Sequence, residues 1–212
     1  MKRRSLSVCS RSQSGFSLVE AAIVLVVIGI VLGAVLQGRS LIENAEYTSF
    51  EKQLRNYRAA FHQFRERYNG LPGDFATAAA RFDSVNPPDG GNGLIDDGPS
   101  CDDAEDESCI AWQHLRAAGL LEGNPTLNGE DASPAHPYGG VIDGFFTGAQ
   151  GNNRFEHKIL ITGLPRDVAI RLDREEDNEL CPTGRVSLVP RSDCDGDDWP
   201  ADETVVNVAY VL

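Results

Sequence analysis

One segment near the amino terminus constrains this chain more than any other. From Phe16 to Leu36 the sequence runs for 21 residues with Glu20 as its only charged side chain. As a helix the segment would measure about 31 Å, which matches the hydrocarbon core of a bilayer. A charge at the centre of such a helix costs about 2.5–3.5 kcal/mol, and somewhat less near its edge. The segment therefore predicts a membrane span, and the position of Glu20 needs an explanation.

The residues in front of this segment predict its orientation. The first fifteen residues contain Lys2, Arg3, Arg4 and Arg11 and no acidic residue. Short flanks rich in Lys and Arg remain in the cytoplasm, so we expect a single pass with everything after the span exported. A secretory signal peptide would have a shorter apolar region and a small-x-small cleavage site, which the following GAVLQGRS does not offer. Hydropathy alone leaves a plain signal anchor as an alternative.

The stretch GFSLVE at the start of the apolar run carries a more specific pattern. A small residue, Gly15, precedes the aromatic Phe16, and Glu20 is the fifth residue after the glycine. This pattern resembles the prepilin signature of type IV pilins and type II secretion pseudopilins. The resemblance implies that prepilin peptidase, in the inner membrane, cuts between Gly15 and Phe16 and methylates the new amino terminus.

The resemblance also implies a task for Glu20. The cut would create a positive amine on Phe16, and a carboxylate about one turn further along can pair with that amine on a neighbouring subunit. Such pairing would offset the cost of a lone charge in lipid. The alternative is that Glu20 only reaches the headgroups. The implied partners are other pilin or pseudopilin subunits, and the choice between the two systems stays open.

Beyond the span the sequence predicts that the helix continues. Residues 41–68 contain neither proline nor glycine, and Asn69-Gly70-Leu71-Pro72 then signals a stop with Gly70 as the cap. Apolar residues recur in steps of four and three, the period of one helix face, at Phe50, Leu54, Tyr57, Phe61, Phe64 and Tyr68. We therefore expect one helix from Phe16 to Tyr68. The expected organisation is a cleaved leader at 1–15, a transmembrane and assembly helix at 16–37, its amphipathic continuation at 38–70 and an exported globular domain at 71–212.

The predicted fold class is α+β, with the long helix packing its apolar stripe on a small antiparallel sheet. The exported domain is rich in Gly, Pro, Asp and Asn, which predicts many loops. We expect short helices within 75–82 and 166–177, and a longer one over 108–123 with Ser108 as N-cap and Gly123 past its end. Strands are expected within 138–146, 154–164, 184–190 and 204–212. In the second of these, Leu160 and Thr162 should face away from Ile159 and Ile161.

The cysteines predict disulfide bonds. There are five, Cys9, Cys101, Cys109, Cys181 and Cys194, and removal of Cys9 with the leader would leave an even number in the exported part. Four cysteines allow three pairings. Proximity in the sequence favours Cys101–Cys109 and Cys181–Cys194, and the lack of a C-x-x-C spacing argues against zinc.

Two acidic loops suggest calcium as a bound ion. Calcium prefers oxygen ligands, and sites with dissociation constants of about 0.1–1 mM suffice in an exported protein. The first candidate set is Asp89, Asn92, Asp96 and Asp97, and the second is Asp193, Asp195, Asp197 and Asp198. Both sets depart from the EF-hand spacing. For each loop the alternative is a solvated acidic surface.

Charge and motifs also exclude some functions. The formal net charge is −13, which argues against binding to nucleic acid. The sequence contains no HExxH, GxSxG or P-loop motif, so we predict that the protein is not an enzyme. We expect a structural subunit of a type IV pilus or type II secretion pseudopilus. The alternative is a membrane-anchored periplasmic module that binds calcium or another ligand and does not polymerise.

Overall fold

The computed structural model describes residues 15, 17–82, 85–86, 90–96, 98–127, 129–149, 155–177 and 179–212. The chain divides into two compact units, Met1–Asn44 and Ala45–Leu212, which we treat separately. Every buried apolar side chain in the described part of the chain lies between Tyr47 and Tyr210. The second unit therefore contains the described core.

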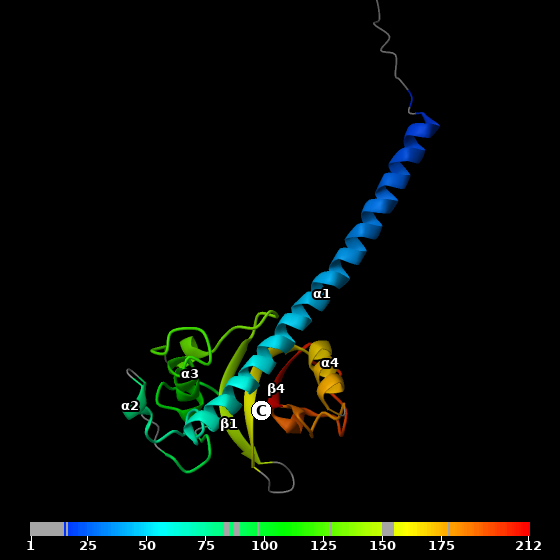
Figure 1. Ribbon diagram of the computed structural model, residues 1–212. Helices are drawn as coiled ribbons and strands as arrows, with labels where there is room; N and C mark the ends of the chain where they lie inside the picture. Colours follow the sequence, from blue (N-terminus) through cyan, green and yellow to red (C-terminus); the bar gives the residue numbers. More distant parts are fainter. Residues whose placement is uncertain are drawn as a thin grey trace, which may run out of the picture. The chain divides into compact units, whose positions relative to one another are not determined.

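The longest element is the helix α1 (Leu18–Tyr68), drawn in blue to cyan in Figure 1. Its predicted start, Phe16, lies outside the described residues, whereas its predicted last residue is confirmed. The predicted cap is wrong, because the left-handed residue after the helix is Asn69, with a φ of 53°. Asparagine is the usual substitute for glycine in that position. Gly70 instead makes room for a ring, since a Cβ there would lie 2.7 Å from the Phe75 side chain.

In the second unit α1 buries most of the predicted apolar stripe. Phe50, Leu54, Phe61 and Phe64 are buried, while Tyr57 and Tyr68 are only partly covered. The Phe61 ring stacks on Phe145 with 5.9 Å between ring centroids. Aromatic side chains thus join the helix to the sheet through large apolar contacts.

The sheet is antiparallel and has the strand order β1-β2-β4-β3. Its strands are β1 (Val141–Ala149), β2 (Phe155–Pro165), β3 (Val186–Leu188) and β4 (Val205–Val211). Each strand overlaps a range that the sequence predicts as a strand. The predicted α+β class, with a long helix on a small antiparallel sheet, is therefore confirmed.

Both faces of β2 are covered at its centre. Four consecutive residues, 158–161, are buried there instead of every second one. The strand lies between β1 and β4, so neighbours flank it on both sides. In register, Lys158 stands between Phe146 and Val211, which can cover its aliphatic stem.

The three shorter helices are α2 (Ala78–Arg81), α3 (Glu107–Ala117) and α4 (Arg166–Glu176). The predicted N-cap of α3 is wrong: Asp106 takes that position, and the Ser108 hydroxyl donates to the Ser100 carbonyl at 2.8 Å. The predicted end is also too late. Gly119 adopts a φ of 70°, and the Leu120 amide donates back to Leu115 at 3.0 Å. This is a Schellman ending, which explains why the helix stops before Gly123.

Within the second unit α2 and α3 lie on one side of α1 and α4 lies on the other (Figure 1). The carboxylate of Glu176 at the end of α4 accepts a hydrogen bond from Arg58 of α1 at 3.3 Å and pairs with Arg185 at 3.4 Å. The Tyr47 hydroxyl donates to Glu175 at 2.8 Å. Polar contacts therefore hold α4 against α1.

Two disulfides close loops in the second unit. Cys101 is bonded to Cys109 and Cys181 to Cys194. This is the pairing that proximity in the sequence favours. The first bond closes the loop that leads into α3, and the second closes the segment that contains β3.

Candidate functional sites in the N-terminal helix and beside it

The first unit presents an apolar helical surface. Its large side chains are exposed, with Leu18 at 90% and Leu25 at 70% of full exposure. An 18-residue window of α1 has a mean hydropathy of 2.8, and none of that window is buried. By length and composition α1 could therefore cross a membrane. Its exposure separates it from the buried core helices of soluble proteins, which can be equally apolar.

Ser17 and Glu20 define the start of α1. The Val19 amide donates to the Ser17 hydroxyl at 3.3 Å, which makes Ser17 the N-cap. Glu20 follows three residues later in the first turn, the place where an acid complements the helix dipole. The sequence S-x-x-E is thus a capping pattern inside the GFSLVE stretch, which the sequence analysis missed. Gly15 is exposed, and Phe16 lies outside the described residues.

The first acidic loop is organised from outside the predicted calcium set. The buried carboxylate of Asp74 accepts hydrogen bonds from the amides of Gly91, Asn92 and Gly93, the last two at 3.0 and 2.7 Å. Asn92 also donates to the Asp96 carboxylate at 2.7 Å. The two other predicted ligands, Asp89 and Asp97, lie outside the described residues. Asp74, which lies six residues after the end of α1, therefore shapes the loop directly.

The second acidic loop is an exposed turn. The backbones of Asp195 and Asp198 exchange two hydrogen bonds of 3.1 Å, and Asp193 ends a short 3-10 helix at Arg191–Asp193. Asp197 is exposed like the other three. Across the described part of the chain, no group of three or more His, Cys, Asp or Glu side chains could hold a metal ion. Calcium binding at either loop stays a prediction.

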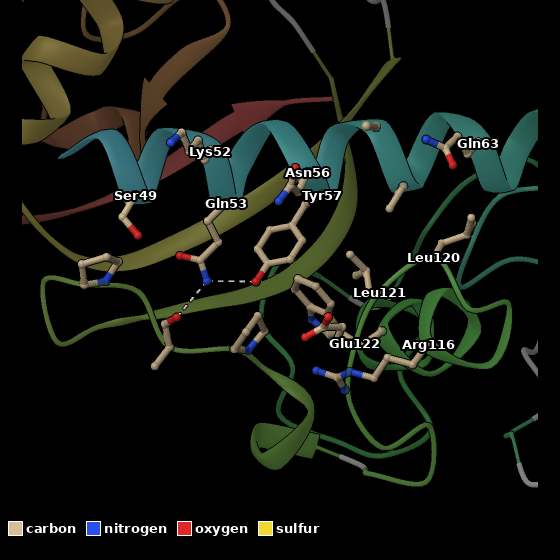
Figure 2. Close-up of a pocket in the computed structure, with 16 residues that line it drawn as sticks. Ser49, Lys52, Gln53, Asn56, Tyr57, Gln63, Arg116, Leu120, Leu121 and Glu122 are labelled. Carbon is tan, nitrogen blue, oxygen red and sulfur yellow. Dashed lines mark hydrogen bonds between the residues drawn. The ribbon is translucent and has the colours of Figure 1, made fainter. Parts of the chain in front are cut away.

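A polar groove lies between α1 and the end of α3. We call it the α1–α3 groove, and it is lined by residues of three segments, 49–63, 112–122 and 134–137. Its volume is about 790 Å³, within the range of ligand pockets. In Figure 2, Gln53 and Tyr57 point from α1 into the groove, and Arg116 and Glu122 lie on the opposite wall. No motif or spacing in the sequence indicates this site.

The α1 wall of the groove is set by an amide and a phenol. The Gln53 amide donates to the Tyr57 hydroxyl and to the Ala135 carbonyl, both at 2.9 Å. Burial raises the pKa of Tyr57, so its hydroxyl stays protonated at neutral pH. Since that oxygen already accepts from Gln53, its own hydrogen can serve as a donor.

The opposite wall contains a guanidinium group in an unusual environment. One terminal nitrogen of Arg116 donates to the Ala132 carbonyl, but Nε and the other terminal nitrogen are buried without a hydrogen-bond partner. The group lies 5.7 Å from the centre of the Trp112 ring. Burial lowers the pKa of Arg116, which reflects the cost of a charge that has lost water. Within the described residues Arg116 forms no salt bridge.

Comparison with known proteins identifies the amino-terminal segment. Residues 10–36 match the family model of the prokaryotic N-terminal methylation motif, the signature of type IV pilins and pseudopilins. Neither a search of curated proteins nor a search of solved structures returned a match. The matched residues include Gly15, Phe16 and Glu20, and they continue into the exposed apolar part of α1. Over these residues the chain is similar to type IV pilin-like proteins, which prepilin peptidase processes.

Proposed function

We propose that the protein is a structural subunit of a type IV pilus or a type II secretion pseudopilus. The observation that carries this proposal is the methylation motif at 10–36 joined to an apolar helical surface whose side chains are exposed. Exposed apolar surface of this extent needs lipid or another apolar helix around it. A subunit that moves from a membrane into a filament would find both.

The proposal gives the amino-terminal residues specific tasks. The peptidase cuts between Gly15 and Phe16, and the new amine of Phe16 carries a positive charge. Glu20 of a neighbouring subunit pairs with that amine and fixes the register of the two helices. Before assembly the protein spans the inner membrane once, with the leader in the cytoplasm. The domain at 71–212 then lies in the periplasm or on the outside of the filament.

A second function is favoured by the α1–α3 groove. A membrane-anchored module that binds a ligand and does not polymerise would need a binding site in its exported domain, and the groove has a suitable size. Both functions require the same membrane helix. They differ in whether the processed chain enters a filament.

The first test is the mature amino terminus, measured by mass spectrometry after expression with a prepilin peptidase. The proposal expects a chain that begins with N-methylated Phe16 and lacks Cys9. An intact leader, or a cut after the apolar run, would contradict it.

The second test separates the two tasks of Glu20. Glu20→Gln keeps a residue that suits a capping box but removes the charge, whereas Glu20→Ala removes both. We expect both variants to insert in the membrane and both to be depleted from purified filaments. Glu43→Gln, on the exposed surface of the same helix, is the matched control and should assemble normally. Normal incorporation of Glu20→Gln would show that the pairing idea is wrong.

A further inference from the structure

We propose that the α1–α3 groove is a binding site for a carboxylate group, which the Arg116 guanidinium receives. The proposal rests on the second unit alone and is independent of filament assembly. Its starting point is the Arg116 guanidinium, which lines the groove and forms no salt bridge within the described residues, while its Nε and Nη1 lack a hydrogen-bond partner. A buried N–H group without an acceptor is costly, and a charged one more so. A carboxylate offers a guanidinium both an opposite charge and two acceptor oxygens.

The charges around the groove favour an anion. Although the whole chain has a formal net charge of −13, the charged residues that line the groove are Lys52 and Arg116 against Glu122. The groove is therefore locally positive within an acidic protein. Glu122 is exposed and forms no ion pair with Arg116, so it competes with an incoming carboxylate only from a distance.

The other residues that line the groove indicate what the rest of the ligand should contain. Asn56 and Gln63 on α1 carry amides that donate and accept hydrogen bonds, and Tyr57 adds a hydroxyl donor. Leu120 and Leu121 supply apolar contact on the opposite side. A polar ligand with a carboxylate at one end fits this combination. The carboxylate can come from a small organic acid or from an acidic side chain of a peptide.

Arg116 is also held rigidly enough to be selective. It stands in the last turn of α3, its guanidinium lies over Trp112, and one nitrogen is fixed on the Ala132 carbonyl. A pre-organised donor loses little entropy when a ligand binds. Replacement by lysine would keep the charge but lose the planar pair of donors.

The test is isothermal titration of the full-length protein in detergent at low ionic strength. Two probes distinguish the sources: glutarate, and a peptide with the acidic sequence of residues 102–107, DDAEDE. A peptide in which amides replace the carboxylates is the negative control. We expect binding of glutarate, of the acidic peptide or of both, which weakens as sodium chloride is added. A preference for the peptide would assign the source to protein, and a preference for glutarate to a small acid.

Variants connect the binding to Arg116. Arg116→Gln should weaken binding by about tenfold to a hundredfold, and Arg116→Lys by an intermediate factor. Arg174→Gln removes the same charge from an exposed site on α4 and should have no effect. Glu122→Gln leaves Arg116 intact and removes the competing charge, so it should tighten binding, whereas Glu203→Gln should not. The proposal is overturned if neither probe binds at millimolar concentration, or if the Arg116 and Glu122 variants all bind like the wild type.

Discussion

The buried histidine of α3 makes acid stability a quantitative test of this structure. His114 is fully buried, and its ring stacks on Phe64 with 6.0 Å between centroids. Its Nδ1 accepts a hydrogen bond of 3.0 Å from the Gly73 amide, so the neutral ring carries its proton on Nε2. Burial lowers the pKa of His114 to about 4, although the backbone of Asn86 opposes that shift.

The direction of the effect follows from comparing folded and unfolded chains. A histidine in the unfolded chain has a pKa of about 6.5. Below that pH the histidine of the unfolded chain binds a proton. In the folded chain His114 stays unprotonated until the pH approaches about 4. The free energy of unfolding must therefore fall as the pH decreases through this window. The difference between the two pKa values corresponds to a loss on the order of 3 kcal/mol.

The measurement is urea unfolding at a series of pH values between 7.5 and 4.5. Fragment 45–212 is suitable because it contains the whole described core. His114→Gln should be less stable than the wild type at pH 7.5 but should lose about 2–3 kcal/mol less on acidification. Burial also lowers the pKa of His136 and His157, so part of the wild-type slope should remain in this variant. His62→Gln, at an exposed position, is the control and should keep the full slope. Equal slopes for His114→Gln and the wild type would refute the reasoning.

Two further predictions concern the loops of the second unit. Replacing Cys181 and Cys194 together by alanine should lower the free energy of unfolding by about 3 kcal/mol, since the bond spans 13 positions in the sequence. An unchanged urea midpoint would contradict it. Asp74→Asn should cost about 1–3 kcal/mol and speed hydrogen exchange at the amides of Gly91 and Gly93, because the carboxylate accepts from both. Asp96→Asn, on the exposed side of that loop, should leave the exchange of those two amides slow.

Local patterns in the sequence were sufficient for the outline of the fold. The period of apolar residues from Phe50 to Phe64 predicts a helix stripe, and most of that stripe is buried. The clean β-branched run at 204–212 predicts β4, and closely spaced cysteines predict the two disulfides. The disulfides join residues that are close in the sequence. The helix stripe and β4 need only an apolar surface to pack against, whichever segment supplies that surface.

Features that depend on distant contacts could not be predicted in this way. The central position of β2 buries Lys158, and no local pattern indicates which strand will be central. The loop around Asn92 is shaped by Asp74, which lies 18 positions earlier in the sequence. Conversely, the S-x-x-E capping pattern of Ser17 and Glu20 is local and can be recognised in the sequence alone.

The wrong prediction for the end of α3 bears directly on the groove. Gly123 was expected to end the helix, but Gly119 ends it earlier, and the chain then turns back toward the last helical turn. A Cβ at Gly123 would lie 2.9 Å from Nε of Arg116, so this glycine lies against the Nε edge of the side chain. From the sequence alone, Arg116 is only a basic residue near the end of a predicted helix, where it complements the helix dipole. The turn after Gly119 partly buries Arg116 by placing Gly123 against its Nε edge, while the side chain still lines the groove where the carboxylate is proposed to bind.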